Sequence, residues 1–239
     1  QAEDGIRDSV ASRGLGDVYK RQLFIVRHGQ TVWNVERRMQ GRLDSPLTEE
    51  GRAQADEHGQ VLNSIGETSG IWSSSACRAR ETTELINQHL KQEVVYSDEL
   101  VERDCGFWSG KTVDEIKNQD PEGYAALKND PYGYRPGGGE NIPDLVARIS
   151  PRLLALNEER FPIIVSHGVV TKAILNFYLD LSEANLMRII HPNNLFFCLG
   201  FRNNEVSVSH YVLEDEKLGV AQEGLYVMRD KESGPIHSE

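Results

Sequence analysis

The sequence contains few cysteines, no long apolar run and fewer basic than acidic residues. It has only three cysteines in 239 residues, an odd number with no metal-type spacing, which argues against a disulfide framework and predicts a reducing, cytoplasmic setting. No apolar run approaches the roughly 20 residues that a membrane-spanning helix needs. Internal repeats and low-complexity stretches are also lacking, which argues against a repeat architecture.

The shortage of basic charge limits the class of partner. The chain has 26 Lys and Arg against 37 Asp and Glu, a net charge of -11 and a pI near 5.2. Nucleic acids and anionic membrane surfaces bind through a basic footprint, so neither is expected to be the main partner.

Residues 1–22 do not resemble part of a folded protein. The first eight residues, QAEDGIRD, are encoded by the codons of a common sequencing-adapter strand, and Ser12–Gln22 resembles a translated transposon-adapter end. A flexible natural leader is the alternative. We expect an adapter artefact outside the fold, which hides the true start of the chain and any signal peptide. Residues 23–239 suit a single domain with a sizeable core.

Strand patterns alternate with helix patterns along that domain, which predicts an α/β fold: a three-layer α/β/α sandwich with a mainly parallel central sheet. Thr48 is the expected N-cap of the first long helix. The expected strands are Leu23–Arg27, Gly70–Ser73, Glu93–Ser97 and Ile163–Ser166, with a late hairpin of Leu195–Phe201 and Glu205–Tyr211 turning at Asn203-Asn204. The expected helices are Thr48–Ile65, Ala76–Leu90, Ile142–Glu159 and Val169–Tyr178.

Two segments are less regular. Residues 111–140 are rich in polar residues, Gly and Pro and end in RPGGGEN, which indicates either a helical insert with a hinge-like loop or a plain helix entry with Asn141 as N-cap. A C-terminal tail is expected over about 212–239, and its role stays open.

The first expected strand stops abruptly at Arg27-His28-Gly29. In open α/β sheets ligands bind outside the carboxyl ends of the strands, and Thr31 and Asn34 add hydrogen-bond donors there. The run predicts an oxyanion pocket, although a solvated strand-to-loop turn is the plainer interpretation.

Three further segments favour the pocket. WSSSACRARETT places Arg78 in the first turn of a helix after a strand and a small-residue turn, and IIVSHGVVTKAI does the same with His167 and Gly168. ELVERDCGFWSG supplies a carboxylate, Glu102. Each also has a plainer interpretation, as a surface arginine, a strand-end histidine or one acid among several.

These four motifs, in this order, resemble the histidine phosphatase superfamily, the phosphoglycerate mutase-like proteins, from Leu23 to about Tyr211. The resemblance implies a phosphoglycerate mutase-like fold, in which His28 is the nucleophile that becomes phosphorylated and Glu102 is the general acid. It also implies that no metal or cofactor takes part. The phosphoryl oxygens would be held by Arg27, Arg78 and His167, and the phosphate site lined by Asn34 and Gln40-Gly41.

The chemistry accounts for these residue types. Phosphoryl transfer needs positioning and positive charge, and arginine forks match phosphate oxygens without losing their charge. His28 must attack through a neutral nitrogen, which requires its other ring nitrogen to be held as a donor. Only the family motif selects Glu102 over the neighbouring acids Glu99, Asp98 and Asp104.

Within that family, the residues after Glu102 favour a phosphatase. Mutases typically continue with a His-Tyr-Gly stretch and a longer basic insert, whereas this chain has DCGFWSG and an insert whose few cations lie among acids: Lys111, Lys117, Lys128 and Arg135. We expect a metal-independent phosphomonoesterase acting on a small phosphorylated metabolite. A phosphoglycerate mutase and a non-catalytic phosphoryl-binding or scaffold protein are the alternatives, and a homodimer is left open. The other histidines are predicted to be ordinary: His58, His89, His191, His210 and His237.

Overall fold

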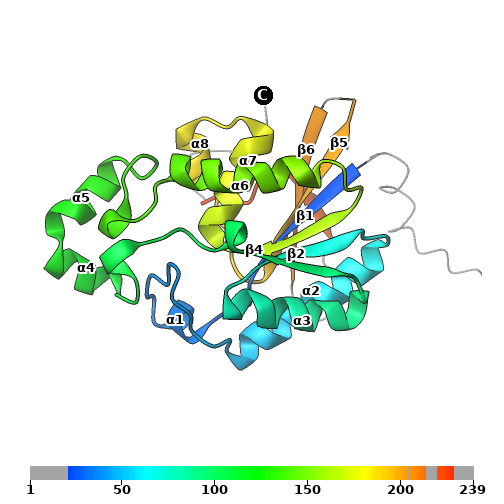
Figure 1. Cartoon of the computed structure of the whole chain (residues 1–239), viewed down its shortest axis with the longest axis horizontal. Coiled ribbons are helices and arrows are strands. Elements are labelled where there is room, and N and C mark those ends of the chain that lie inside the picture. Colours follow the sequence, from blue (N-terminus) through cyan, green and yellow to red (C-terminus); the bar gives the residue numbers. More distant parts are fainter. Residues whose placement is uncertain (1–20, 204, 214–219, 229–239) are drawn as a thin grey trace, which may run out of the picture.

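The fold is built on one mixed β-sheet with the strand order β3-β2-β4-β1-β5-β6-β7 (Figure 1). The computed structural model describes residues 21–203, 205–213 and 220–228, and all structural statements refer to these. Four neighbouring strands are parallel: β1 (Arg21–Arg27), β2 (Gly70–Ser74), β3 (Val94–Ser97) and β4 (Pro162–Ser166). The other three pair antiparallel: β5 (Leu195–Arg202), β6 (Glu205–Val212) and β7 (Ala221–Glu223).

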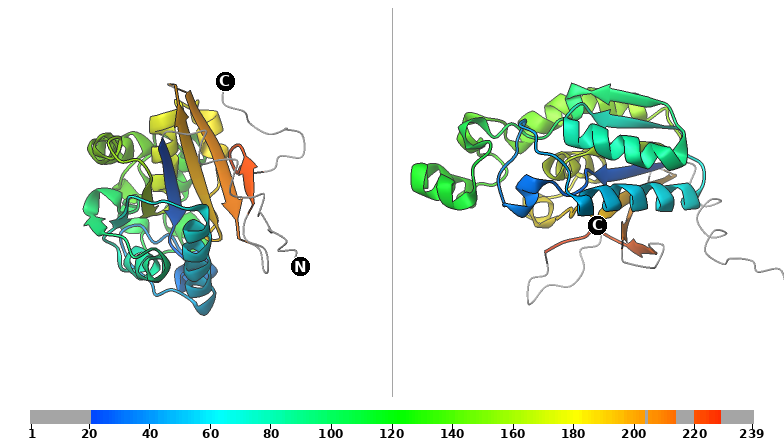
Figure 2. Two further views of the ribbon diagram at one scale, coloured as in Figure 1. Left: turned by 90° about the vertical axis from the view of Figure 1, so that its right-hand side faces the viewer. Right: turned by 90° about the horizontal axis from the view of Figure 1, so that it is seen from below.

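Helices cover both faces of the sheet because the buried strands are apolar on both sides. Leu23 and Ile25 of β1 belong to one hydrophobic cluster, whereas Phe24 and Val26 belong to the other, as the two-residue period of a strand requires. On the first face lie α6 (Ile142–Leu156), α7 (Gly168–Leu179) and α8 (Glu183–Arg188), and on the second lie α2 (Glu49–Ile65) and α3 (Cys77–Leu90) (Figures 1 and 2). The expected α/β sandwich is confirmed, with a sheet that is parallel in one half and antiparallel in the other.

The expected strands and helices are present with small shifts at their ends. Thr48 caps α2 by accepting a hydrogen bond from the backbone N–H of Gly51, and α6 ends at Leu156 rather than Glu159. The pair Arg202↔Glu205 closes the expected hairpin, and Asn203 has a φ of 49°, while Asn204 lies outside the described residues. Two short α-helices, α1 (Val32–Val35) and α8, and the short strand β7 have no counterpart in the sequence prediction. The same is true of the 3-10 turns at Asp98–Leu100, Gly106–Trp108 and Pro136–Gly138.

Strand β1 begins two residues earlier than expected, inside the segment that the sequence excluded from the fold. Arg21 and Gln22 pair with Phe201 and Gly200 of β5, and the Arg21 guanidinium lies 4.0 Å from the centre of the Phe201 ring. Residues 1–20 lie outside the described residues, so an adapter origin for them stays a prediction.

The region 111–140 contains two short helices, α4 (Val113–Gln119) and α5 (Pro121–Asn129), which lie toward the same end of the molecule as α1 (Figure 1). Asn141 also caps α6, in a reciprocal capping box with Asp144. The region therefore contains the expected helical insert, and it also leads into a helix that Asn141 caps. A hinge-like role for its loop stays a prediction. In the expected tail, β7 pairs with β6 and Leu225 is buried.

Candidate active site

The site lies where β1 and β4 end side by side. The backbone N–H of His28 donates to the carbonyl of Ser166 at 3.0 Å, so the two strand-end histidines, His28 and His167, come together. Their ring centres are 5.2 Å apart, and both side chains are buried. Sequence positions 139 residues apart thus meet through one parallel strand pairing.

The ring of His28 is oriented by its own loop. Nδ1 lies 2.8 Å from the carbonyl oxygen of Gly29, and because a carbonyl only accepts, Nδ1 carries the proton and Nε2 keeps its lone pair. The backbone carbonyl of His28 accepts a hydrogen bond from Asn193 at 2.7 Å. Burial, with the charges of Arg78 and Arg27, lowers the pKa of His28 well below its usual range. The imidazole is therefore neutral at pH 7, as a nucleophile requires.

Gly29, directly after His28, allows a close contact between two backbone segments. A Cβ at Gly29 would lie 2.1 Å from the backbone oxygen of Gly51, and a Cβ at Gly51 would lie 2.0 Å from the backbone oxygen of Gln30. The two glycines let the first turn of α2 pack directly on the loop that carries His28.

His167 is the N-cap residue of α7, and its Nε2 lies 2.8 Å from the hydroxyl of Ser74. That hydroxyl already accepts from the N–H of Ala76, so it is placed to donate its own proton to Nε2. The proton of the neutral ring then resides on Nδ1, which is buried and has no hydrogen-bond partner among the described residues. Burial and the charge of Arg78 lower the pKa of His167 well below its usual range.

The two arginines are held by hydrogen bonds to backbone carbonyls. Arg27 donates through Nη1 to the carbonyl of His191. Arg78, only 1% exposed, donates to the carbonyls of Leu43 at 2.8 Å and Gly41 at 2.9 Å. Among the described residues, Nε of Arg27 and Nε of Arg78 are buried without a partner, which is uncommon for buried donors.

Asp44 was missed by the sequence prediction. Ala76 occupies the N-cap position of α3 and provides no side-chain cap, and the carboxylate of Asp44 accepts from the N–H groups of Cys77 and Arg78 instead, at 3.0 and 3.4 Å. The same carboxylate pairs with Nη1 of Arg78 at 2.8 Å. No sequence signal marks this role, because Asp44 precedes the helix by more than 30 residues.

The three serines before Arg78 make hydrogen bonds to other side chains around the site. Ser73 accepts from the hydroxyl of Thr83, Ser74 bonds His167, and Ser75 donates to Asp98. These hydroxyls tie α3, β4 and the segment after β3 together around the site.

Glu102 and Arg78 both line a pocket of about 580 Å³. The carboxylate of Glu102 accepts from the N–H of Arg103 at 2.9 Å and from the N–H of Val169, in the first turn of α7, at 3.3 Å. Glu102 is also close enough to Arg27 to raise the pKa of that guanidinium, against the larger lowering effect of burial. His28, Arg27 and His167 are not among the residues that line the pocket, which are Gly41, Arg42, Asp44, Ser75, Ala76, Arg78, Asp98, Glu99, Val101, Glu102 and Arg148.

The residues expected to bind substrate fall into two groups. Thr31 and Asn34 form a reciprocal capping box at α1, and Gln40 donates to the Thr31 hydroxyl at 2.8 Å, so these side chains are bonded mainly to one another. Gly41 lines the pocket, and Gly168 lies against Arg27, where a Cβ would be 3.6 Å from the guanidinium carbon.

His191 and His58, for which the sequence predicted no role in the site, make contacts that hold site residues in place. The carbonyl of His191 accepts from Arg27, and the ring of His58 lies 3.0 Å from the carbonyl of Asn193, whose amide holds the backbone of His28. His210 and His89 are remote from these contacts, and His237 lies outside the described residues.

Acidification is expected to destabilise the fold through these buried histidines. Burial lowers the pKa of His58 to about 4 and that of His191 to about 3. In the unfolded chain both histidines titrate near pH 6.5, so between about pH 6.5 and 5 they bind protons there but stay neutral in the folded protein. The free energy of unfolding therefore falls as the pH falls. Each histidine contributes up to about 1.4 kcal/mol per pH unit, a limit approached where the unfolded chain is protonated and the folded chain is not. Urea unfolding measured at pH 7, 6 and 5 tests this, and His58→Gln should show a shallower slope; a pH-independent free energy would contradict it.

In the residues that the structure covers, no group of three or more His, Cys, Asp or Glu side chains could hold a metal ion. No described helix is both long and apolar enough to cross a membrane. The three cysteines, Cys77, Cys105 and Cys198, are free.

Comparison with known sequences decides the family. Residues 23–213 match the family described as the histidine phosphatase superfamily, branch 1. The chain belongs to this superfamily. The match covers the span over which the four motifs predicted it, and it makes the chain a phosphatase- or mutase-like enzyme by descent.

Members of the histidine phosphatase superfamily that are similar to this chain include both a probable mutase and phosphatases. The probable phosphoglycerate mutase GpmB of Salmonella paratyphi C is 31% identical over 196 residues, which are 81% of this chain and 91% of that protein. Mycobacterial glucosyl-3-phosphoglycerate phosphatase, in a structure with VO3, is also 31% identical, with a TM-score of 0.70 over 77% of this chain and 94% of that chain. The alpha-ribazole phosphatase from Shigella flexneri has a TM-score of 0.71 over 87% of this chain and 99% of its own, and at 21% identity it shows the fold alone.

Proposed function

We propose that the protein is a phosphomonoesterase that hydrolyses a small phosphorylated metabolite through a phosphohistidine at His28. One observation carries the proposal: among the residues that the structure describes, Nε of Arg27, Nε of Arg78 and Nδ1 of His167 are buried without hydrogen-bond partners, and the His28 imidazole beside them is neutral. Buried donors normally have acceptors. The oxygens of a transferred phosphoryl group would provide them.

The proposed reaction has two displacements in line. Nε2 of His28 attacks phosphorus, the bond to the ester oxygen breaks, and Glu102 donates its proton to the leaving alkoxide. Water then attacks the phosphohistidine, Glu102 takes back a proton, and inorganic phosphate leaves with His28 neutral again. Arg27 and Arg78 stabilise the charge on the phosphoryl oxygens in both steps. These two guanidinium groups supply the positive field, so we propose that no metal is required.

The free thiols are consistent with the proposed cytoplasmic location, because a reducing compartment keeps cysteines unpaired. This location rests on composition and chemistry, and fractionation of the native host would test it directly.

A phosphoglycerate mutase is the second candidate, favoured by the 31% identity to a probable enzyme of that name. Against it, two of the cations of the insert are neutralised: Arg135 makes two bonds of 2.7 Å to Asp144, and Lys117 pairs with Asp114 at 3.2 Å. Hydrolysis is therefore the function that the site supports better.

The decisive experiment assays the full chain against a panel of phosphate esters and 3-phosphoglycerate in the presence of EDTA. We expect release of inorganic phosphate from at least one ester, with EDTA leaving the rate unchanged. Formation of 2-phosphoglycerate without phosphate release would establish the mutase instead. Phosphate binding without either reaction would favour the non-catalytic alternative, and inhibition by EDTA that added metal reverses would refute the metal-free mechanism.

A further inference from the structure

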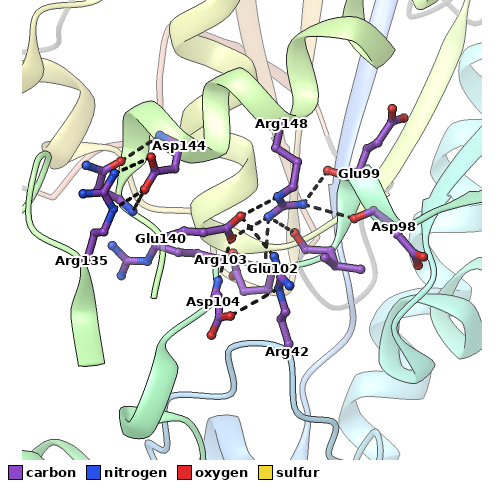
Figure 3. Close-up of polar contacts among 12 residues, drawn as sticks. Arg42, Asp98, Glu99, Glu102, Arg103, Asp104, Arg135, Glu140, Asp144 and Arg148 are labelled. Atoms are coloured by element: carbon purple, nitrogen blue, oxygen red, sulfur yellow. Dashed lines mark hydrogen bonds and ion pairs between the residues drawn. The ribbon is translucent and has the colours of Figure 1, made fainter. Parts of the chain in front are cut away.

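Arg148, on α6, lies beside the pocket and points its guanidinium at the segment that carries Glu102 (Figure 3). Its side chain is only 18% exposed. The guanidinium donates to four backbone carbonyls of that segment: Asp98 at 3.3 Å, Glu99 at 2.7 Å, Val101 at 3.0 Å and Glu102 at 3.4 Å. One side chain thus bonds the backbone on both sides of Leu100 and ends at the carbonyl of Glu102 itself.

Glu140 fixes the orientation of this guanidinium. Its carboxylate receives Nε of Arg148 at 2.9 Å and Nη2 at 3.0 Å, the bidentate geometry that is stronger and more directional than a single bond. The same carboxylate accepts from the N–H of Asp104 at 2.9 Å and from Arg42 at 3.2 Å (Figure 3). The pair therefore holds the backbone immediately before and after Glu102.

Such support matters because the segment has little structure of its own. Apart from one 3-10 turn at Asp98–Leu100, the chain between β3 and the turn at Gly106–Trp108 belongs to no helix or strand. Within the described part of the chain, the carboxylate of Glu102 accepts from two backbone N–H groups, one of them adjacent in sequence. Its place in the pocket therefore depends on where the backbone is held.

We propose that Arg148, oriented by Glu140, is a positioning residue that sets the location of the Glu102 carboxylate and thereby governs how well the enzyme cleaves esters with poor leaving groups. The inference rests on the proposed function, in which Glu102 protonates the leaving oxygen. An alkyl alkoxide leaves only with that proton, whereas p-nitrophenolate departs without it. A misplaced Glu102 carboxylate should therefore slow the cleavage of alkyl phosphates and leave the cleavage of p-nitrophenyl phosphate nearly unchanged.

The test measures the rate of phosphohistidine formation in single turnovers of the full-length protein, with p-nitrophenyl phosphate and with an alkyl phosphate that the native enzyme hydrolyses. Arg148→Met should lower the rate with the alkyl ester by about 100-fold and with p-nitrophenyl phosphate by less than about threefold. Arg148→Lys keeps the charge but loses the planar fork, so an intermediate and equally selective loss is expected.

Arg152 provides the matched control. It lies one turn further along α6 and pairs with the side chain of Glu99 at 2.8 Å, on the same segment as Glu102 but away from its backbone. Arg152→Met should leave both rates unchanged. Glu140→Gln, which keeps Arg148 but removes its charged partner, is the second variant if Arg148→Met unfolds, and it should show the same selectivity.

The possible outcomes distinguish a failure of the positioning role of Arg148 from a failure of the proposed function. Equal losses with both esters, or no loss with either, would overturn the positioning role while leaving the proposed function intact. Failure of the unmodified protein to form a phosphohistidine with either ester would overturn the proposed function and this inference together.

Discussion

Replacing His28 with alanine is expected to abolish phosphate release, with a loss on the order of 10⁶-fold when a covalent nucleophile is removed. The structure gives the physical reason. Nδ1 of His28 donates its proton to the carbonyl oxygen of Gly29, 2.8 Å away. Burial, with the charges of Arg78 and Arg27, holds the pKa of His28 well below its usual range. The lone pair of Nε2 is therefore available for attack on phosphorus. Among the described residues, His167 is the nearest imidazole, and its Nε2 is engaged with Ser74.

The measurement combines phosphate release with isolation of acid-labile labelled protein after incubation with a labelled ester. His89→Ala is the matched control, because His89 pairs with Asp56 between α2 and α3 and touches none of the site residues. Thermal unfolding of both variants separates lost chemistry from lost folding. A labelled phosphoenzyme that persists in His28→Ala would show that another residue is the nucleophile.

Replacing Arg78 with methionine is expected to lower kcat by about 100-fold or more, the loss typical of removing one preorganised transition-state donor. Its guanidinium is 1% exposed and is fixed by the carbonyls of Gly41 and Leu43 and by Asp44, which leaves Nε directed to no protein acceptor among the described residues. Such a donor needs no reorganisation when charge develops on the phosphoryl oxygens. Methionine keeps the length of the stem and removes the charge.

Because Arg78 also ties down residues 41–44, the kinetic result needs a structural control. Arg80→Met changes an arginine two residues further along α3 that is not among the pocket-lining residues. Its guanidinium stacks on Tyr96 at 3.9 Å and donates to the backbone carbonyl of Ser75. This variant should keep full activity. The Arg78 variant is also compared by titration with inorganic phosphate, which should bind more weakly. An Arg78→Met enzyme within a few-fold of the native kcat would remove this residue from the phosphoryl site.

Much of the fold could be predicted because its determinants are local. About a dozen residues are enough to recognise the apolar runs of β1 and β4 and the small-residue turn before α3. The strands predicted from these apolar runs are present at the expected positions. The short α1 and α8 and the edge strand β7 escaped prediction because four, six and three residues carry too little periodicity. Likewise, β1 extends back to Arg21 because β5 offers it backbone partners, which composition cannot reveal.

The supporting residues of the candidate site could not be found in this way. Asp44 and Arg148 are ordinary charged residues in their local sequence, and only the fold places one at the first turn of α3 and the other against the carbonyls before Glu102. His58 and His191 have unremarkable neighbours in sequence, yet the fold buries both behind His28 and Arg27.

The sequence alone determined the family, the order of the strands and helices that carry the motifs, and the identity of the groups at the strand ends. This was possible because the local pattern of apolar and polar residues sets where strands end and helices begin. Tertiary structure decided what these groups can do. Burial makes His28 neutral, backbone carbonyls use up all but one nitrogen of Arg78, and the Arg148–Glu140 pair places the backbone of Glu102. These effects depend on desolvation and on contacts between distant segments, and both arise only when the chain is folded.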